Sequence, residues 1–109
     1  MSYQSPVEFS NVTATCKANI YFDGKVVSHA IVLADGTRKT FGVIFPGSYR
    51  FDTGAAEVME IIAGDCRVRI ADREQWQEYG AGSCFEVPGN TFFTIEVQDG
   101  AAEYVCSYK

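Results

Sequence analysis

The chain has 109 residues, 47% of them hydrophobic and 21% charged, which suits one ordinary globular domain. Its 14 acidic and 9 basic residues give a net charge of −5, the opposite of what a protein that neutralises the phosphates of nucleic acid or of a membrane surface needs. Any site for an anionic ligand must therefore be a local group of cations. The chain contains a single histidine, His29, so a metal site with several histidine ligands is excluded.

The cysteines and the ends of the chain bear on where the protein works. Cys16, Cys66, Cys84 and Cys106 show no Cys-x-x-Cys spacing. No apolar run approaches the roughly 20 residues of a transmembrane helix, and the N-terminus lacks the basic start and apolar stretch of a signal peptide. We expect a cytoplasmic protein with reduced thiols.

Turn signals such as Asp23-Gly24, Asp35-Gly36, Pro46-Gly47 and Pro88-Gly89 recur at intervals of mostly about ten residues, which is the spacing of strands and turns. The runs between the turns are rich in β-branched and aromatic residues. They predict strands over 26–33, 37–45, 49–53, 57–63, 66–71, 76–79, 83–87, 91–97 and 102–108. The first two form a predicted hairpin around Asp35-Gly36, and 57–63 is predicted to pair with 66–71 across Gly64-Asp65.

This succession of strands, with no helix to cover them, predicts an all-β fold built as a closed or doubly layered antiparallel sheet. Alternation of apolar and polar residues in 67–70 and 93–98 indicates one buried and one solvated face. Residues 1–18 are expected to be a polar arm that ends in an edge strand. Residues 19–109 are expected to form the single domain.

Two spaced motifs resemble those of the cupin superfamily, which is a jelly-roll β-barrel: Glu57-x6-Gly64, and Gly82-x5-Pro88-Gly89. Metal-binding cupins carry His-x-His before the glutamate and a further histidine after the proline. Here Arg50, Asp52 and Phe93 occupy those positions, and an alignment anchored on Gly47 places Thr53 and Ala55 at the first two instead, so neither alignment supplies a histidine. The resemblance implies the barrel and gives no support for a metal site.

A more specific resemblance covers residues 19–109 and is to the pyrimidine/purine nucleoside phosphorylases, a family of small cupins. The segments that carry it, in order, are Asn19-Ile20-Tyr21-Phe22-Asp23-Gly24-Lys25-Val26, Arg38 ahead of Gly42-Val43, Gly47-x-Tyr49-x-Phe51, Glu57-x-Met59, Gly64, Trp76, 79–89, Phe93 and Tyr104-x-Cys106. The resemblance implies a metal-free and cofactor-free homodimer. It also implies phosphorolysis of purine and pyrimidine nucleosides to a free base and pentose 1-phosphate.

Such a reaction needs a phosphate site, a ribose site and a site for the base, because its transition state resembles an oxocarbenium ion. Arg38 is the candidate for phosphate, since a guanidinium fork matches two phosphate oxygens; the alternative is a solvated hairpin arginine. Glu57 occupies the inward-facing cupin position. It either accepts hydrogen bonds from the ribose hydroxyls, which we favour, donates a proton to the leaving base, or is structural.

Aromatic side chains are the candidates for contact with the ribose or base. Tyr49, Phe51 and Phe93 could stack on it, and stacking tolerates many bases because it needs only a π-face. The alternative is that all three belong to the core. Arg50 points either to the solvated face or into a cavity, and Glu60, of opposite parity to Glu57, is expected to be solvated.

Two other functions stay open at this stage. The first is a non-catalytic barrel that binds or senses a small molecule. The second is a metal-dependent cupin oxygenase, for which His29, Asp52 and Glu57 make a poor ligand set, because non-haem iron favours two histidines and a carboxylate.

Overall fold

The computed structural model describes residues 6–109, and it confirms the prediction of an all-β fold. The strands are β1 (Thr13–Ala14), β2 (Asn19–Tyr21), β3 (Val26–Val32), β4 (Arg38–Ile44), β5 (Gly47–Asp52), β6 (Glu57–Ala63), β7 (Asp65–Ile70), β8 (Gln77–Gly80), β9 (Cys84–Val87), β10 (Phe92–Val97) and β11 (Ala102–Tyr108). A short 3₁₀ turn, η1 (Phe22–Gly24), separates β2 from β3. Within residues 6–109, no helix has the length and apolar character needed to cross a membrane.

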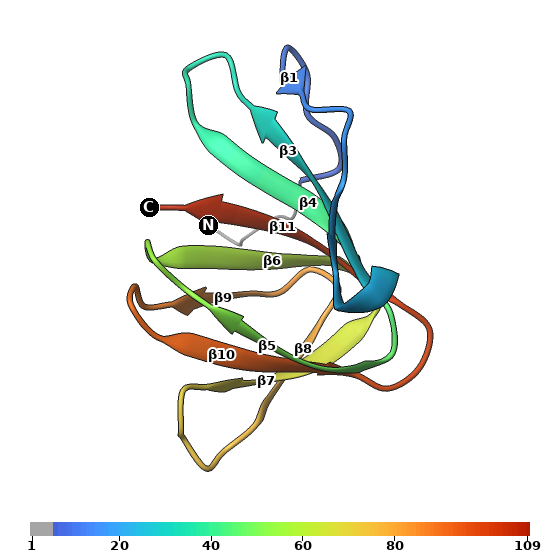
Figure 1. Ribbon diagram of the computed structural model, residues 1–109, viewed down its shortest axis with the longest axis vertical. Coiled ribbons are helices and arrows are strands. Elements are labelled where there is room, and N and C mark those ends of the chain that lie inside the picture. The colour runs from blue at the N-terminus through green and yellow to red at the C-terminus, as the bar shows by residue number, and fades with distance from the viewer. Residues whose placement is uncertain (1–5) are drawn as a thin grey trace.

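The strands form two antiparallel sheets that lie against each other (Figure 1). The larger sheet has the order β1-β3-β4-β11-β6-β9, with β2 also paired to β3, and the smaller has the order β5-β10-β7-β8. The strand pairings of residues 6–109 keep the two sheets separate, so hydrogen bonding does not close them into one barrel. The architecture is therefore a two-layer sheet fold.

The predicted hairpin between the third and fourth strands is confirmed. β3 and β4 pair in the register Val26↔Ile44 to Val32↔Arg38. The backbone N–H of Thr37 donates to Oδ1 of Asp35 over 2.9 Å, and Gly36 adopts a φ of +89°. The side chain of Asp35 accepts a hydrogen bond from the turn backbone, and Gly36 tolerates a positive φ, so this pair of residues suits the turn.

The predicted pairing of 57–63 with 66–71 is wrong. β6 pairs with β11 and β9 in the larger sheet, whereas β7 pairs with β10 and β8 in the smaller one. Gly64 makes the change of layer possible: its φ is +77°, and a Cβ at this position would lie 2.2 Å from the carbonyl oxygen of Ala101. The two strands therefore enter opposite layers of one core instead of forming a hairpin.

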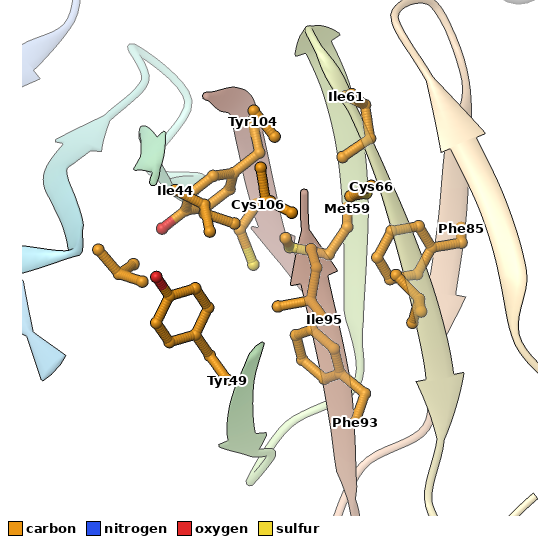
Figure 2. Packing of buried hydrophobic residues seen from close by; sticks show 14 of the residues in the cluster. Ile44, Tyr49, Met59, Ile61, Cys66, Phe85, Phe93, Ile95, Tyr104 and Cys106 are labelled. Atoms are coloured by element: carbon orange, nitrogen blue, oxygen red, sulfur yellow. The ribbon is translucent and has the colours of Figure 1, made fainter. Parts of the chain in front are cut away.

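The core fills the space between the inner faces of the two sheets (Figure 2). Met59, Tyr104 and Cys106 come from the larger sheet, and Phe93 and Ile95 face them from the smaller one. All five side chains are buried. The strands β6, β7, β9, β10 and β11 each contribute every second residue to the core, which is the periodicity of a half-buried strand.

The outer face of the larger sheet is less exposed than its sequence pattern predicts. Part of the segment 6–14 lines a groove there together with Ile31 and Val105, both of which are buried. Glu60 lies opposite Val105 on this face and is only 9% exposed, so the expectation that it is solvated is wrong. Glu60 has the predicted parity, opposite to that of Glu57, but this side of the sheet does not face open water.

Candidate functional site

A cavity of about 500 Å³ lies between the two sheets, and its two walls differ in chemistry. The larger sheet supplies a mainly polar wall, made by Ser28, Thr40, Glu57, Tyr104, Cys106 and Tyr108 together with the apolar Ile44 and Met59. The smaller sheet and the η1 region supply a mainly aromatic wall, made by Tyr21, Phe22, Phe51 and Phe93, with Arg50 and Asp52 also lining the cavity on this side. A ligand with an apolar face and a hydroxyl-bearing edge fits such a cavity best.

The polar wall follows from strand register. Tyr104, Cys106 and Tyr108 alternate along β11 and therefore share one face of the sheet. Cys106 lies opposite Thr40 of β4, and Tyr108 lies opposite Glu57 of β6. The three strands thus bring a carboxylate, a thiol and two hydroxyls to one end of the cavity.

Glu57 and its neighbours are hydrogen bonded. The Sγ of Cys106 donates to Oε1 of Glu57 over 3.4 Å, and the hydroxyl oxygens of Thr40 and Tyr108 lie 3.3 Å apart. Burial raises the pKa of Glu57, although the bond from Cys106 opposes this. Burial also raises the pKa of Cys106 to about 12 and that of Tyr108 to about 12, so both remain protonated at neutral pH.

A second polar group lies farther along the same wall. Ser28 is 3% exposed, and its Oγ accepts a hydrogen bond from Nδ2 of Asn19 over 3.3 Å. Burial raises the pKa of Tyr104, and a hydrogen bond with Ser28 works against that rise. The Tyr104 phenol is therefore held as a neutral donor.

The aromatic wall is a contiguous set of rings. The rings of Phe51 and Phe93 are stacked, with centroids 5.7 Å apart and planes inclined by 27°. Phe22 meets Phe51 edge-on at 5.5 Å, and Tyr21 meets it edge-on at 6.1 Å. Edge-on and offset contacts of this kind are those that aromatic quadrupoles favour.

The structure brings three of the candidate residues together, since Glu57, Phe51 and Phe93 all line the cavity. Tyr49 does not line it: the side chain is 4% exposed, and its hydroxyl lies 2.8 Å from the carbonyl oxygen of Phe45 and 2.9 Å from that of Pro46. A phenol that is bonded in this way fixes the turn before β5. Figure 2 shows Tyr49 at the edge of the core cluster.

Arg38 lies beyond one end of the cavity. It begins β4 on the same face as Thr40, roughly 7 Å along the strand, and its side chain is exposed. It takes part in none of the ion pairs found in residues 6–109. Arg38 is thus an exposed cation on the cavity face, next to the Glu57 end.

Two of the other arginines, Arg50 and Arg67, have partners. Arg50 borders the cavity, but its guanidinium carbon lies 3.9 Å from the ring centroid of Phe92, and its Nε is 3.2 Å from Oδ1 of Asp52. Arg67 pairs with Glu96 on the outer face of the smaller sheet, with Nη2 2.7 Å from Oε1. These contacts turn both side chains toward the outside of the smaller sheet.

Several lining residues were not singled out from the sequence, among them Tyr21, Phe22, Thr40 and Tyr108. The period of two in Tyr104, Cys106 and Tyr108 was available and marks one face of a strand. No comparable pattern marks Phe22, because its position depends on an irregular turn.

The donor set of the cavity does not fit a metal ion. Residues 6–109 contain no group of three or more His, Cys, Asp or Glu side chains placed to hold one. Asp52 points toward Arg50, and Cys106 donates its proton to Glu57. His29 lies apart from the cavity, near the carbonyl oxygen of Thr15.

Two antiparallel sheets around an internal cavity, with an inward glutamate on β6, define a cupin-like all-β protein. The fold resembles Bacillus subtilis oxalate decarboxylase, with a TM-score of 0.72 at 16% identity over 97% of this chain and 31% of that one. It also resembles a crystal structure of a protein of unknown function from Acinetobacter sp. ADP1, with a TM-score of 0.90 at 44% identity over 94% of this chain and 98% of that one.

The sequence profile of the pyrimidine/purine nucleoside phosphorylases matches residues 16–108. A curated relative from Cupriavidus taiwanensis with that same name is 61% identical over 102 residues, which are 94% of this chain and 96% of the relative. The chain belongs to the pyrimidine/purine nucleoside phosphorylase family, as the sequence motifs predicted.

Proposed function

We propose that this protein is a broad-specificity nucleoside phosphorylase. It transfers the pentose of a purine or pyrimidine nucleoside to inorganic phosphate, and so acts as a pentosyltransferase. The observation that carries the proposal is the cavity with one hydroxyl- and carboxyl-bearing wall and one aromatic wall, which matches the two chemical halves of a nucleoside. Membership of the family supports the same assignment.

In the proposed reaction, a phosphate oxygen forms a bond to the anomeric carbon while the N-glycosidic bond breaks. The electron pair of that bond leaves with the base nitrogen, which takes up the proton that the attacking hydrogen phosphate gives up. Glu57 accepts hydrogen bonds from the ribose hydroxyls, and these bonds strengthen as positive charge develops on the sugar. Its neighbours Cys106 and Tyr108 keep it in place at the polar wall.

Arg38 is the proposed phosphate ligand. Its support is its place on the cavity face of β4, its exposure and its lack of a partner among the ion pairs of residues 6–109. A guanidinium can bind two phosphate oxygens at once, and it would offset the protein's overall negative charge locally. Phosphate would then enter from the Glu57 end of the cavity.

Phe51 and Phe93 are the proposed aromatic contacts of the substrate, and Tyr49 is left out because it is bonded within the fold. Contact with a π-face does not distinguish one base from another, which explains tolerance of both purines and pyrimidines. A site built on specific polar contacts to the base would reject analogues strongly.

We further propose that residues 19–109 form the catalytic domain, that residues 1–18 are an accessory arm, and that the protein acts as a homodimer in the cytoplasm. Two exposed apolar side chains on the outer face of the larger sheet, Val7 and Phe41, line the same groove and support a self-association surface there. Light scattering on the purified protein tests the dimer, and a monomer at all micromolar concentrations would contradict it.

The activity is tested by release of free base from uridine, inosine, adenosine and guanosine, with and without inorganic phosphate, on chelator-treated protein. Phosphate-dependent release from both classes of nucleoside is expected. Release without phosphate would indicate hydrolysis, and no release would favour a protein that only binds its ligand.

A further inference from the structure

The turn between β2 and β3 holds its backbone in an unusual conformation. Phe22, Asp23 and Gly24 have φ values of +52°, +56° and +89° in succession. Glycine adopts such angles freely, but residues with a Cβ do so at a cost, and three in a row are rare. Strain of this kind persists only where the surroundings impose it, and it concentrates at ligand sites.

The strained turn holds two large rings at the edge of the cavity, and we call Tyr21 and Phe22 the aromatic rim. Phe22 contacts Tyr49 and Phe51, with centroid distances of 5.0 Å and 5.5 Å, yet it remains 45% exposed. Tyr21 is 44% exposed. Packing alone would not favour a strained backbone that leaves two rings half in water.

The backbone of the aromatic rim lies toward the end of the cavity opposite the backbone of Glu57, and both of its rings contact Phe51. Tyr21 pairs with Val26, which lies in line across the sheet with Ile44 and Ala102 at the start of β11. Glu57 pairs with Tyr108 at the end of β11, roughly 20 Å farther along the strand. In Figure 1 the η1 turn lies at this far end, close to one end of β5.

We propose that the aromatic rim is the binding surface for the planar base of the substrate. This inference rests on the proposed function and extends the aromatic contact with the base from Phe51 and Phe93 to Tyr21 and Phe22. The base lies against the exposed sides of Tyr21 and Phe22, the ribose extends along the polar wall, and phosphate approaches from the Glu57 end. Phe22 therefore contributes to nucleoside affinity and leaves phosphate affinity unaffected.

The test compares Phe22→Ala and Phe22→Leu with Phe45→Ala, a matched control. Phe45 is 44% exposed, like Phe22, but it does not line the cavity. The KM values for uridine, inosine and phosphate are measured together with the midpoint of thermal unfolding. Loss of a stacking contact is expected to raise the nucleoside KM about tenfold in Phe22→Ala, more for inosine than for uridine. The phosphate KM and the control are expected to stay within twofold of wild type.

A fourth variant, Phe22→Gly, separates the ring from the backbone strain. Both Phe22→Gly and Phe22→Ala lack the ring, so the same nucleoside KM is expected for both. The glycine variant should melt at a higher temperature than the alanine variant, because glycine is not strained at positive φ. A ring that merely supports the fold would leave the nucleoside KM of both variants at the wild-type value, or would make that KM follow the loss of stability, so that it differs between the two variants.

Equal nucleoside KM values in Phe22→Ala and Phe45→Ala would overturn the inference, as would a parallel rise in the phosphate KM. Should Phe22→Ala fail to fold, the nucleoside KM values of Phe22→Leu and Tyr21→Leu are compared with that of Phe45→Ala instead. An inactive wild-type protein is a different outcome, since it overturns the proposed function itself and the base assignment with it.

Discussion

The thiol of Cys106 donates a hydrogen bond to the carboxyl group of Glu57, with 3.4 Å between Sγ and Oε1. A thiol is a weak donor, so Glu57 is oriented while most of its capacity to accept hydrogen bonds stays available. The bond joins β11 to β6 at the polar wall of the cavity. The pair therefore holds an acceptor in place without satisfying it fully, as a ribose-binding group requires.

Replacing Glu57 by Gln should lower kcat/KM by about tenfold to a hundredfold, because a charged acceptor for the ribose hydroxyls is lost. Burial raises the pKa of Glu57 above its usual value of 4.5. In the wild type, activity should therefore fall on acidification at a higher pH than for an ordinary glutamate. A pH profile that Glu57→Gln leaves unchanged would contradict the assignment.

Glu57→Gln should raise the stability of the fold at pH 7 even though it lowers the activity. A carboxyl whose pKa is raised by folding stabilises the native state below pH about 4.5, and this stabilisation is lost as the pH rises through the folded value. Glu57→Gln should thus unfold at a higher denaturant concentration than wild type at pH 7, and the difference should vanish near pH 4. Chemical denaturation at the two pH values measures this.

Variants of Cys106 should shift the pKa of Glu57, because the hydrogen bond from the thiol lowers it. Cys106→Ala removes the donor and should move the acid limb of the pH profile to higher pH, with a loss in kcat/KM of about fivefold at neutral pH. Cys106→Ser supplies a stronger donor and should move that limb to lower pH. Identical profiles for the two variants would show that Cys106 acts only by packing.

Arg38→Ala should raise the phosphate KM by at least about tenfold, because charge-assisted hydrogen bonds to phosphate contribute roughly 1.5–3 kcal/mol. The nucleoside KM and the thermal unfolding midpoint should change little, since Arg38 is exposed. Lys39→Ala is the matched control: Lys39 is the next residue of β4, points to the outer face and contacts Ser107 there. A loss of the same size in both variants would argue against a specific phosphate site.

The cysteines should differ in reactivity. Cys16 and Cys84 are exposed, whereas burial protects Cys66 and raises its pKa to about 11, and Cys106 is buried with a pKa of about 12. Alkylation of the folded protein at pH 8 should modify Cys16 and Cys84 only, and unfolding should make the other two reactive. Rapid labelling of Cys106 in the native protein would show that the cavity opens.

The fold could be predicted from the sequence where its signals are local. Asp35-Gly36 fixes a hairpin because both strands follow directly on the turn. Gly64-Asp65 has the same appearance, but β6 finds its partner in β11, some forty residues farther along the chain, and no local pattern encodes that distance. Strand order thus depended on which faces meet in the core.

The residues of the candidate site also divide into those that a local sequence pattern predicts and those that it does not. Glu57, Phe51 and Phe93 follow from strand parity and motif spacing, and all three line the cavity. Phe22 could not be found in this way, because its place depends on positive φ at residues that are not glycine. Tyr49 has the right parity, but the carbonyls that bind its hydroxyl are fixed by the turn before β5.

The most direct test of the account is a ³¹P NMR time course of the chelator-treated protein with inosine or uridine and inorganic phosphate. The account predicts that the phosphate signal declines while a pentose 1-phosphate signal grows in equal amount, with both nucleosides and without added metal. Release of free base while the phosphate signal stays constant would mean that water is the acceptor. That result would contradict the central claim.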